Sequence, residues 1–249
     1  MEDISSKTSF EKACAFCAKK KSAENRMQKC GRCAAIRYCG AACQKEHWPV
    51  HRPRCKEIVA RQKEEGIANI ARMNELFDVA LDYIRANDLR SLKALLDDNP
   101  RLVDFQSEEF SGTTLLHSAV EVNPRAVVLM LYNHADVNIQ DSNGRTALYM
   151  ACCYGHRDIV KMLLEKQADV NIQNSEGFTA LYMASQNEHK DIVTMLLEKQ
   201  ADVNIQESEG CTALLMASEN GHKDIVTMLL EKQADVNIQN SEGATALHI

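Results

Sequence analysis

The sequence is 249 residues long, and its formal net charge of −6 hides an asymmetry between its two ends. Residues 1–60 contain 13 Lys and Arg against 6 Asp and Glu, a net charge of +7, whereas residues 61–249 carry −13. No apolar stretch is long enough to span a membrane, and the N-terminus lacks the apolar segment of a secretory signal. We therefore expect an intracellular protein, cytoplasmic or nuclear, whose oppositely charged parts do different work and whose ten cysteines are metal ligands or thiols.

The basic end of the sequence opens with a polar stretch, residues 1–13, for which we predict disorder. Four pairs of metal-ligand residues follow, and each pair has two or three residues between its members. Such spacing lets both donors of a pair face one ion, so eight donors make two tetrahedral sites, and thiolates with one imidazole favour zinc. All eight donors are used, so neither zinc keeps an open position and both are predicted to be structural. The pairs are Cys14 and Cys17, Cys30 and Cys33, Cys39 and Cys43, and His51 and Cys55.

Spacing alone leaves open whether successive pairs share a zinc or interleave. Residues 14–55 resemble the MYND zinc finger in these pairs, in Tyr38-Cys39 and in the segment that contains Gln44 and Trp48. That resemblance implies an interleaved arrangement. By it, one zinc is held by Cys14, Cys17, Cys39 and Cys43, and the other by Cys30, Cys33, His51 and Cys55.

The same resemblance implies a partner for the finger. MYND fingers dock short peptides of the type P-x-L-x-P through a Gln and a Trp, which match Gln44 and Trp48 here. An extended proline-rich segment loses little entropy when it docks against an aromatic ring. Two alternatives stay open: Trp48 packs the small core of the finger instead, or the basic finger binds nucleic acid. The second is opposed by the acidic remainder of the chain and by the lack of an obvious recognition helix among the Lys and Arg residues.

Two weaker patterns connect the finger to the rest of the chain. Residues 56–70 are charged and are predicted to form a linker or a helix. Residues 71–108 contain two apolar sets at helical spacing, separated by Asn87-Asp88, which predicts two short antiparallel amphipathic helices. We expect this pair to be a divergent first unit that caps a repeat array covering residues 71–249.

A period of 33 residues governs the remaining sequence. The copy at residues 168–200 matches the next copy, 201–233, at 28 of 33 positions, and the previous one, 135–167, at 24 of 33. Each copy has a Gly-containing turn, a Thr that can cap a helix and two apolar-patterned segments, which predicts turn, helix, helix. One unit cannot bury its own apolar face, so neighbours must stack into a continuous core. Units are expected from about residues 109, 141, 174 and 207, with a truncated one at 240–249.

The copies carry G-x-T-A-L-Y-M-A, H-x-D-I-V, M-L-L-E and A-D-V-N, and in these motifs the array resembles the ankyrin repeat. The resemblance implies a mainly α-helical solenoid of helix-turn-helix units with β-turn tips, preceded by the small two-zinc finger. It also implies that the turn tip and first helix of each unit face a concave groove that binds another protein. Ankyrin repeats usually have Gly where this chain has Gln167, Gln200 and Gln233, and a left-handed Gln would cost roughly 1 kcal/mol at each position.

The copies differ mainly at the turn tip and along the first helix, and the ankyrin resemblance makes these positions candidate partner contacts. The alternative is drift on a solvated face, since the contacts that carry binding energy are a minority of any surface. The candidates are Arg145, Cys153, Tyr154, Phe178, Gln186, Asn187, Cys211, Glu219 and Asn220. We expect Cys152 to be packed and Cys153 to be exposed. The recurring His156, His189 and His222 are predicted to make capping or turn contacts where second helices start.

The sequence favours a non-enzymatic adaptor that binds proteins at both the finger and the groove. No Ser-His-Asp set, phosphate-binding Gly loop or open metal site in the sequence supports catalysis. A nucleic-acid-associated regulator is the first alternative. An enzyme is the second, because MYND-like fingers also accompany methyltransferase domains in other proteins. The sequence stops inside the first helix of a unit, so we expect it to be a fragment or the product of an incomplete gene model.

Overall fold

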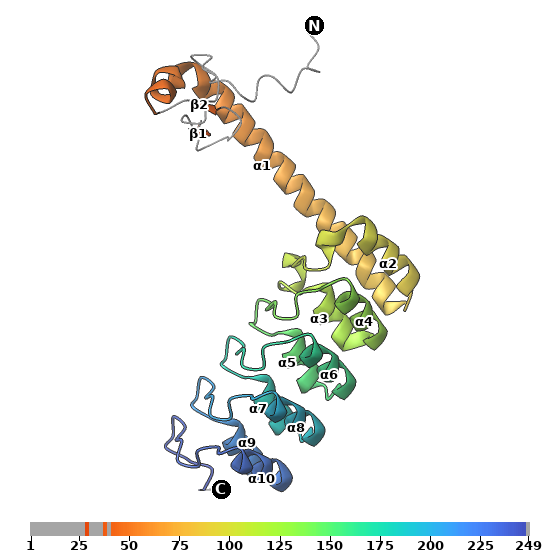
Figure 1. The fold of residues 1–249 in the computed structure, drawn as a ribbon, viewed down its shortest axis with the longest axis vertical. Coiled ribbons are helices and arrows are strands. Elements are labelled where there is room, and N and C mark those ends of the chain that lie inside the picture. Colours follow the sequence, from red (N-terminus) through yellow and green to blue (C-terminus); the bar gives the residue numbers. More distant parts are fainter. Residues whose placement is uncertain (1–27, 30–36, 39–40, 248–249) are drawn as a thin grey trace, which may run out of the picture. The chain divides into compact units, whose positions relative to one another are not determined.

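The computed structural model describes residues 28–29, 37–38 and 41–247, with side chains described from residue 58 onward (Figure 1). The disorder predicted for residues 1–13 therefore lies outside the described residues. The chain divides into two compact units, Met1–Arg72 and Met73–Ile249.

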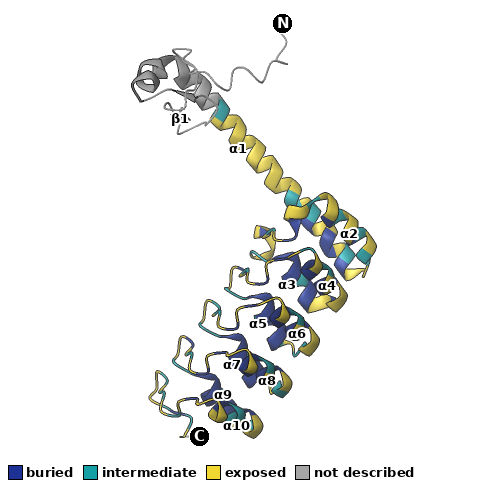
Figure 2. Cartoon of the chain, viewed as in Figure 1, coloured by how far each residue is buried: buried dark blue, intermediate teal, exposed yellow. Residues whose placement is uncertain are grey.

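In the first unit, two short paired strands precede a long helix. Strands β1 (Gln28–Lys29) and β2 (Arg37–Tyr38) are antiparallel, and Gln28 lies opposite Tyr38. Helix α1 (Ala41–Arg85) follows and is 45 residues long. Its residues 59–72 are all exposed, so the stretch predicted to be a linker or a helix is helical and buries no apolar face (Figure 2).

The second unit begins with the helix pair predicted for residues 71–108. Phe77 near the end of α1 is fully buried, and α2 (Leu89–Asp98) adds two buried leucines to the same core. The break between the helices lies at Asn87, whose φ of 55° is left-handed, and at Asp88, whose carboxylate caps the first turn of α2. The pair is confirmed with one difference: its first helix is the end of α1 rather than a separate short helix.

Four further helix pairs make the array, and their turn tips project on one side of the helix stack (Figure 1). The structure has ten α-helices in the part of the chain that it describes, and two 3-10 turns, Pro100–Leu102 and Glu108–Phe110, lead from α2 into the array. The prediction of a mainly α-helical solenoid is confirmed. The pairs are α3 (Leu115–Val122) with α4 (Pro124–Tyr132), α5 (Ala147–Cys153) with α6 (Arg157–Glu165), α7 (Ala180–Gln186) with α8 (Lys190–Glu198), and α9 (Ala213–Glu219) with α10 (Lys223–Glu231).

Local sequence sets where these helices begin. Thr146, Thr179 and Thr212 precede α5, α7 and α9, and each hydroxyl accepts the N–H three residues further on at 3.1 to 3.2 Å. A threonine cap of this kind satisfies one of the N–H groups that the first helical turn leaves unpaired. Pro124 is the first residue of α4, where its missing N–H has no cost. The cap at Thr179 agrees with the expectation that each copy has a Thr that caps a helix.

Backbone and side-chain hydrogen bonds link consecutive turn tips. The N–H of Ser175 donates to the carbonyl of Asn143 at 2.9 Å, and the same bond recurs at 2.9 and 2.7 Å in the next two tips. A second ladder uses glutamine amides. Gln140 Nε2 donates to the carbonyl of Gly144 at 2.7 Å and to that of Gln173 in the next unit at 3.0 Å. Because each tip is bonded to its neighbours, the tips form a continuous row beside the inner helices.

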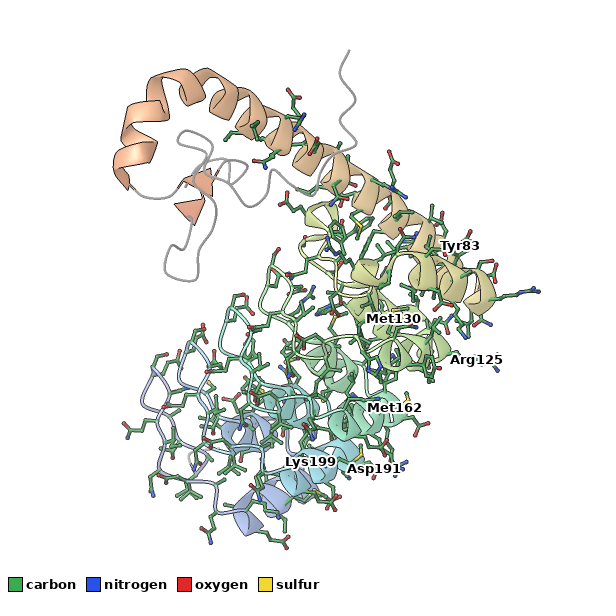
Figure 3. All side chains as sticks on the ribbon, turned by 45° about the horizontal axis from the view of Figure 1, so that its top comes forward. Tyr83, Arg125, Met130, Met162, Asp191 and Lys199 are labelled. Carbon is green, nitrogen blue, oxygen red and sulfur yellow. The ribbon has the colours of Figure 1, made fainter. Side chains whose placement is uncertain are left out.

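The core of the array lies between the inner and outer helices, as stacking requires (Figure 2). Leu163, Leu196 and Leu229 hold the same position in three successive outer helices, and none has exposed area. Most outward-facing positions on the outer helices are polar, and Val128, Tyr132 and Leu230 are exposed exceptions. Figure 3 shows Arg125 extending away from α4, whereas Met130 of the same helix is fully buried.

Three glutamines adopt the backbone conformation that ankyrin repeats usually give to glycine. The φ angle is 63° at Gln167, 60° at Gln200 and 64° at Gln233, so the left-handed geometry considered from the sequence is present. A left-handed Gln costs roughly 1 kcal/mol relative to Gly, because its Cβ crowds the backbone. Glu188 is also left-handed, with φ of 60°, at a position where both neighbouring units have glycine.

Candidate functional site

The predicted zinc ligands of the finger, with Gln44 and Trp48, lie within residues 14–55, whose side chains are outside the described residues. Their chemistry fits zinc, because seven thiols and one imidazole in four close pairs supply two complete tetrahedral donor sets. Between residues 58 and 247, no three His, Cys, Asp or Glu side chains lie close enough to hold a metal ion. The array therefore offers no competing metal site in its described part.

The cavities in the described part of the chain include two that lie along the groove between turn tips and inner helices. The first has a volume of about 420 Å³ and lies between the end of α1, the inner helix α3 and two turn tips. Apolar side chains such as Ile84 and Phe110 line it together with Glu121 and Arg145, so charges of both signs meet there. We refer to it as the mixed pocket. Of the predicted partner contacts, Arg145 lines this pocket.

Arg145 is held by a carboxylate of its own turn tip. Its Nη2 and Nε atoms lie 2.7 and 2.8 Å from Oδ2 of Asp141, whose side chain is fully buried. The other carboxylate oxygen of Asp141 accepts the backbone N–H groups of Asn143 and Arg145, both at 2.9 Å. The hydrogen bond to Asp141 raises the pKa of the Arg145 guanidinium. Arg145 is therefore a fixed cation on the groove surface.

A buried histidine connects α3 to the same tip. The N–H of Thr114 donates to Nδ1 of His117 at 3.2 Å, so Nδ1 is an acceptor and the ring proton is on Nε2. Nε2 in turn donates to the carbonyl of Arg145 in the next unit at 3.0 Å. Burial lowers the pKa of His117, so the ring is neutral at neutral pH.

The second cavity, of about 470 Å³, lies further along the groove beside α7 and α9. We refer to it as the acidic pocket, because five carboxylates line it and its described lining includes no Lys or Arg. None of the five forms an ion pair with a described side chain. An aromatic pair forms part of the wall, with the ring centroids of Phe178 and Tyr182 4.8 Å apart. The carboxylates are those of Glu176, Glu207, Glu209, Glu219 and Glu242.

The turn tip that carries Glu207 and Cys211 sets the local charge of the acidic pocket. The Glu207 carboxylate accepts the N–H of Cys211 at 2.8 Å and that of Glu209 at 2.9 Å. Burial alone would raise the pKa of Glu207, but these hydrogen bonds outweigh it and lower the pKa. Burial raises the pKa of the Cys211 thiol. At neutral pH the tip thus presents a carboxylate beside an uncharged thiol.

The structure corrects one expectation about the two adjacent cysteines. Cys152 is fully buried, as predicted, and burial raises the pKa of its thiol. Cys153 was expected to be exposed, but it is half-buried because the next unit packs beside it, where Asn187 Nδ2 donates to its carbonyl at 3.4 Å. Burial raises the pKa of the Cys153 thiol as well. Both residues are therefore protonated thiols, poor metal ligands and poor nucleophiles.

The remaining predicted contacts lie on the accessible part of the groove-side segments. Tyr154 is 47% exposed, and Glu219 and Asn220 are also exposed. Asn187 is exposed and its Nδ2 donates to the carbonyl of Met183 at 3.0 Å. These positions are accessible to a partner, whereas contact with one stays a prediction.

The recurring histidines occupy helix starts without capping them through their side chains. His156, His189 and His222 are the N-cap residues of α6, α8 and α10, and none makes a side-chain capping hydrogen bond. His222 instead bonds to the preceding unit, where its Nε2 lies 3.1 Å from the carbonyl oxygen of Gln186. The expected turn contact is therefore an inter-unit contact at His222.

Tyr182 and Glu207 are among the residues of the acidic pocket that the sequence-based candidates omit. A signal for both was present, since they occupy two of the five positions at which the copies from residues 168 and 201 differ. Tyr182 falls on the apolar stripe of its helix, where a side chain is expected to serve the core. Only the three-dimensional arrangement brings it to the cavity wall.

Comparison with known families agrees with this architecture, in which stacked helix pairs follow a cysteine-rich segment in the sequence. Residues 80–174, 116–207 and 201–249 match ankyrin repeats (3 copies), and residues 14–55 match the MYND finger. The chain belongs to the ankyrin-repeat family and carries an N-terminal MYND zinc finger. Zinc binding and a protein-interaction arrangement follow from these two families.

Similar curated proteins share only short segments with the chain. It is 34% identical over 79 residues to the probable E3 ubiquitin-protein ligase XBOS32 of Oryza sativa subsp. japonica, which covers 32% of this chain and 16% of that protein. It is 37% identical over 62 residues to the histone-lysine N-methyltransferase ASHR1 of Arabidopsis thaliana, covering 25% and 12%. It is 44% identical over 46 residues to the N-lysine methyltransferase SMYD2 of Sus scrofa, covering 18% and 10%. The chain thus spans less than a fifth of each of these relatives.

Helix length and hydropathy decide whether a helix could cross a membrane. Within the described residues, no helix combines the length and the apolar character that crossing a membrane requires.

Proposed function

We propose that the chain is a non-enzymatic adaptor with two protein-binding sites, a two-zinc finger at residues 14–55 and the groove of the array at residues 71–249, joined by residues 56–70. One observation carries the proposal for the groove. Two copies that match at 28 of 33 positions differ at five, and residues at four of those five positions line the acidic pocket. Variation concentrated at a cavity, on an otherwise constant scaffold, favours recognition over drift. The candidate contacts outside the pocket, such as Tyr154 and Asn187, extend the same surface.

For the finger, we infer two interleaved zinc sites, as the MYND resemblance implies. Zinc content measured by mass spectrometry is expected to be two ions per chain. Cys17→Ser and Cys33→Ser each remove one ligand from a different site, and each is expected to reduce the content toward one. Cys153→Ser is the matched control and is expected to retain two, because that thiol lies in the array. A content of one zinc in the unaltered chain would contradict the two-site arrangement.

Docking of a proline-containing peptide at the finger is tested by fluorescence. Trp48 is the only tryptophan in the chain, so its emission reports on the proposed site directly. A P-x-L-x-P peptide is expected to give a saturable change in the zinc-loaded protein, and a peptide with the prolines and leucine replaced by alanine is expected to give none. Gln44→Ala is expected to weaken binding without loss of zinc. If the emission stays flat throughout the titration, Gln44 and Trp48 are structural residues.

A second candidate function rests on the charge of residues 1–60, which is +7. A basic finger can bind nucleic acid through phosphate contacts, and such binding weakens steeply as salt is added. A duplex DNA titration at low and moderate salt separates this candidate from the adaptor. Steep salt dependence supports it, and the absence of binding at low salt removes it.

A further inference from the structure

The acidic pocket has a second feature beyond its carboxylates. Tyr182 is only 5% exposed and lines the cavity, yet its hydroxyl makes no hydrogen bond among the described residues. Its pKa is raised first by burial and then by Cys211, Glu207 and Glu219, which line the same pocket. A phenol hydroxyl can both donate and accept, so one without a protein partner is completed by a ligand or by water. The polar end of Tyr182 therefore lies where an incoming polar group could reach it.

Another repeat of the same chain places an arginine guanidinium at the position equivalent to the acidic pocket. In the unit that starts at about residue 141, the guanidinium of Arg145 bonds to Asp141 and lies near the phenol of Tyr149. Two repeats later, Glu207 replaces Asp141 and Cys211 replaces Arg145. The carboxylate is thus retained, and the arginine that would occupy the space beside it is replaced by a small thiol.

We propose that the acidic pocket binds an arginine side chain presented by a partner polypeptide, with Glu207 and Glu219 as its carboxylate partners and the rings of Phe178 and Tyr182 as its wall. This proposal rests on the groove's proposed role in protein binding and specifies the chemistry of that partner. A guanidinium fits because it is planar, always charged, and able to stack on a ring while its N–H groups bond to carboxylates.

The geometry favours an organic cation over a metal ion. The carboxylates of the acidic pocket surround a cavity of about 470 Å³, and no three of the described acidic side chains converge closely enough to hold a metal. The aromatic pair at 4.8 Å would contribute nothing to a hydrated metal but provides a face for a guanidinium. Charge complementarity points the same way, since no described ion pair neutralises these carboxylates.

The proposal can be tested by NMR on the full zinc-loaded chain with ¹³C-labelled methionine methyl groups. Met216 lines the acidic pocket, and Met130 is buried elsewhere in the array and serves as an internal reference. The probe is a blocked glycine-serine peptide with one central arginine. The comparison peptides carry lysine or citrulline at that position, because citrulline keeps the shape of arginine without its charge. The arginine peptide is expected to shift Met216 saturably, with citrulline weaker by about tenfold or more.

Two substitutions copy residues that other repeats of this chain have at equivalent positions, so they are expected to change the pocket and keep the fold. Glu219→Gln introduces the residue that the preceding unit has at the same position, Gln186, and is expected to weaken the arginine peptide by about threefold. Cys211→Arg recreates the arrangement of Arg145 and is expected to abolish binding by filling the pocket from within. Glu198→Gln removes an equal charge from the exposed end of α8 and is expected to leave binding unchanged. Circular dichroism of each variant checks that the array is folded.

Three outcomes overturn the proposal. The first is no shift of Met216 with any peptide. The second is equal binding of the arginine and lysine peptides with equal losses in Glu219→Gln and Glu198→Gln, which would indicate general charge attraction. The third is unchanged binding in folded Cys211→Arg. The Trp48 titration separates this result from the adaptor function: if the proline peptide still docks, the finger site stands even when the arginine pocket fails.

Discussion

The units at residues 135–167 and 201–233 have the same fold but present different groove surfaces. Leu163 and Leu229, at equivalent core positions, are both without exposed area. In the repeat at residues 135–167, Arg145 bonds to Asp141. In the repeat at residues 201–233, the small side chain of Cys211 leaves the acidic pocket open. The comparison teaches that stacking fixes the core residues of every unit, whereas a few groove positions can change charge and shape without disturbing the helices.

The largest effect on stability is expected at a leucine position that two neighbouring repeats share, because the side chain there is buried in one repeat and exposed in the other. Leu197 is 6% exposed, while Leu230 at the same position one unit later is 44% exposed. Leu197→Ala is expected to lower the free energy of unfolding by about 2–4 kcal/mol through lost burial and a cavity. Leu230→Ala is expected to cost less than about 1 kcal/mol. Chemical denaturation of both variants tests the difference, and equal losses would contradict the burial assigned to the two units.

An intermediate effect on stability is expected at the ion pair of Asp141 and Arg145, which is found in the repeat at residues 135–167. Asp141→Asn keeps an acceptor for the turn N–H groups but removes the charge beside Arg145, and it is expected to cost about 1–2 kcal/mol. Adding Arg145→Phe to the Asp141→Asn variant copies the tip of the next unit, which has Asn174 and Phe178. The double variant is expected to lose less stability than the sum of the single ones. Strict additivity in a double-mutant cycle would show that the pair is not coupled.

A smaller gain is expected from relieving a left-handed residue. Gln200 has φ of 60° and is exposed, so Gln200→Gly is expected to raise the free energy of unfolding by roughly 1 kcal/mol. Gln200→Ala keeps the Cβ and is the control, with no gain expected. Thermal unfolding of the two variants distinguishes relief of backbone strain from a side-chain effect, which would appear in both.

The smallest effect is a pH dependence carried by His117. Its folded-state pKa is lowered from 6.5 by burial, so the neutral ring contributes stability above the unfolded pKa that is lost as pH falls through the folded pKa. Stability is therefore expected to decline below about pH 6.5. His117→Tyr, which introduces the residue that Tyr149 and Tyr182 supply at this position, should decline less steeply. Urea titrations of both proteins at neutral and mildly acidic pH give the free energy of unfolding at each pH. If this free energy falls equally with pH in both proteins, His117 is not the cause.

Much of the array could be predicted because its signals are local and repeated. The cap at Thr179, the helix start at Pro124 and the break at Asn87 each follow from the chemistry of one residue and its neighbours in the chain. A left-handed backbone at Gln200 was considered because the ankyrin repeat, which the array resembles, usually has Gly at this position. The sequence left residues 56–70 as a linker or a helix, and it did not decide between the two because residues 59–72 carry no buried face that would mark a helix by its pattern.

The groove was predicted less completely, because a cavity depends on residues that the chain brings together from several units. Position 178 was identified from variation between copies, but Tyr182 follows the same periodicity as core residues. Glu242 belongs to a different unit from Tyr182, yet both line the acidic pocket. The half-burial of Cys153 likewise depends on its surroundings in the stack rather than on its helix alone.

The presence of two independent binding sites on one chain can be tested most directly by a paired titration. The zinc-loaded chain is titrated with the P-x-L-x-P peptide while Trp48 fluorescence and the Met216 methyl signal are followed together, with and without the arginine peptide. The expected result is that the proline peptide changes only Trp48, that the arginine peptide changes only Met216, and that neither alters the Kd of the other. Competition between the two peptides, or a response of both reporters to one peptide, would contradict two separate sites.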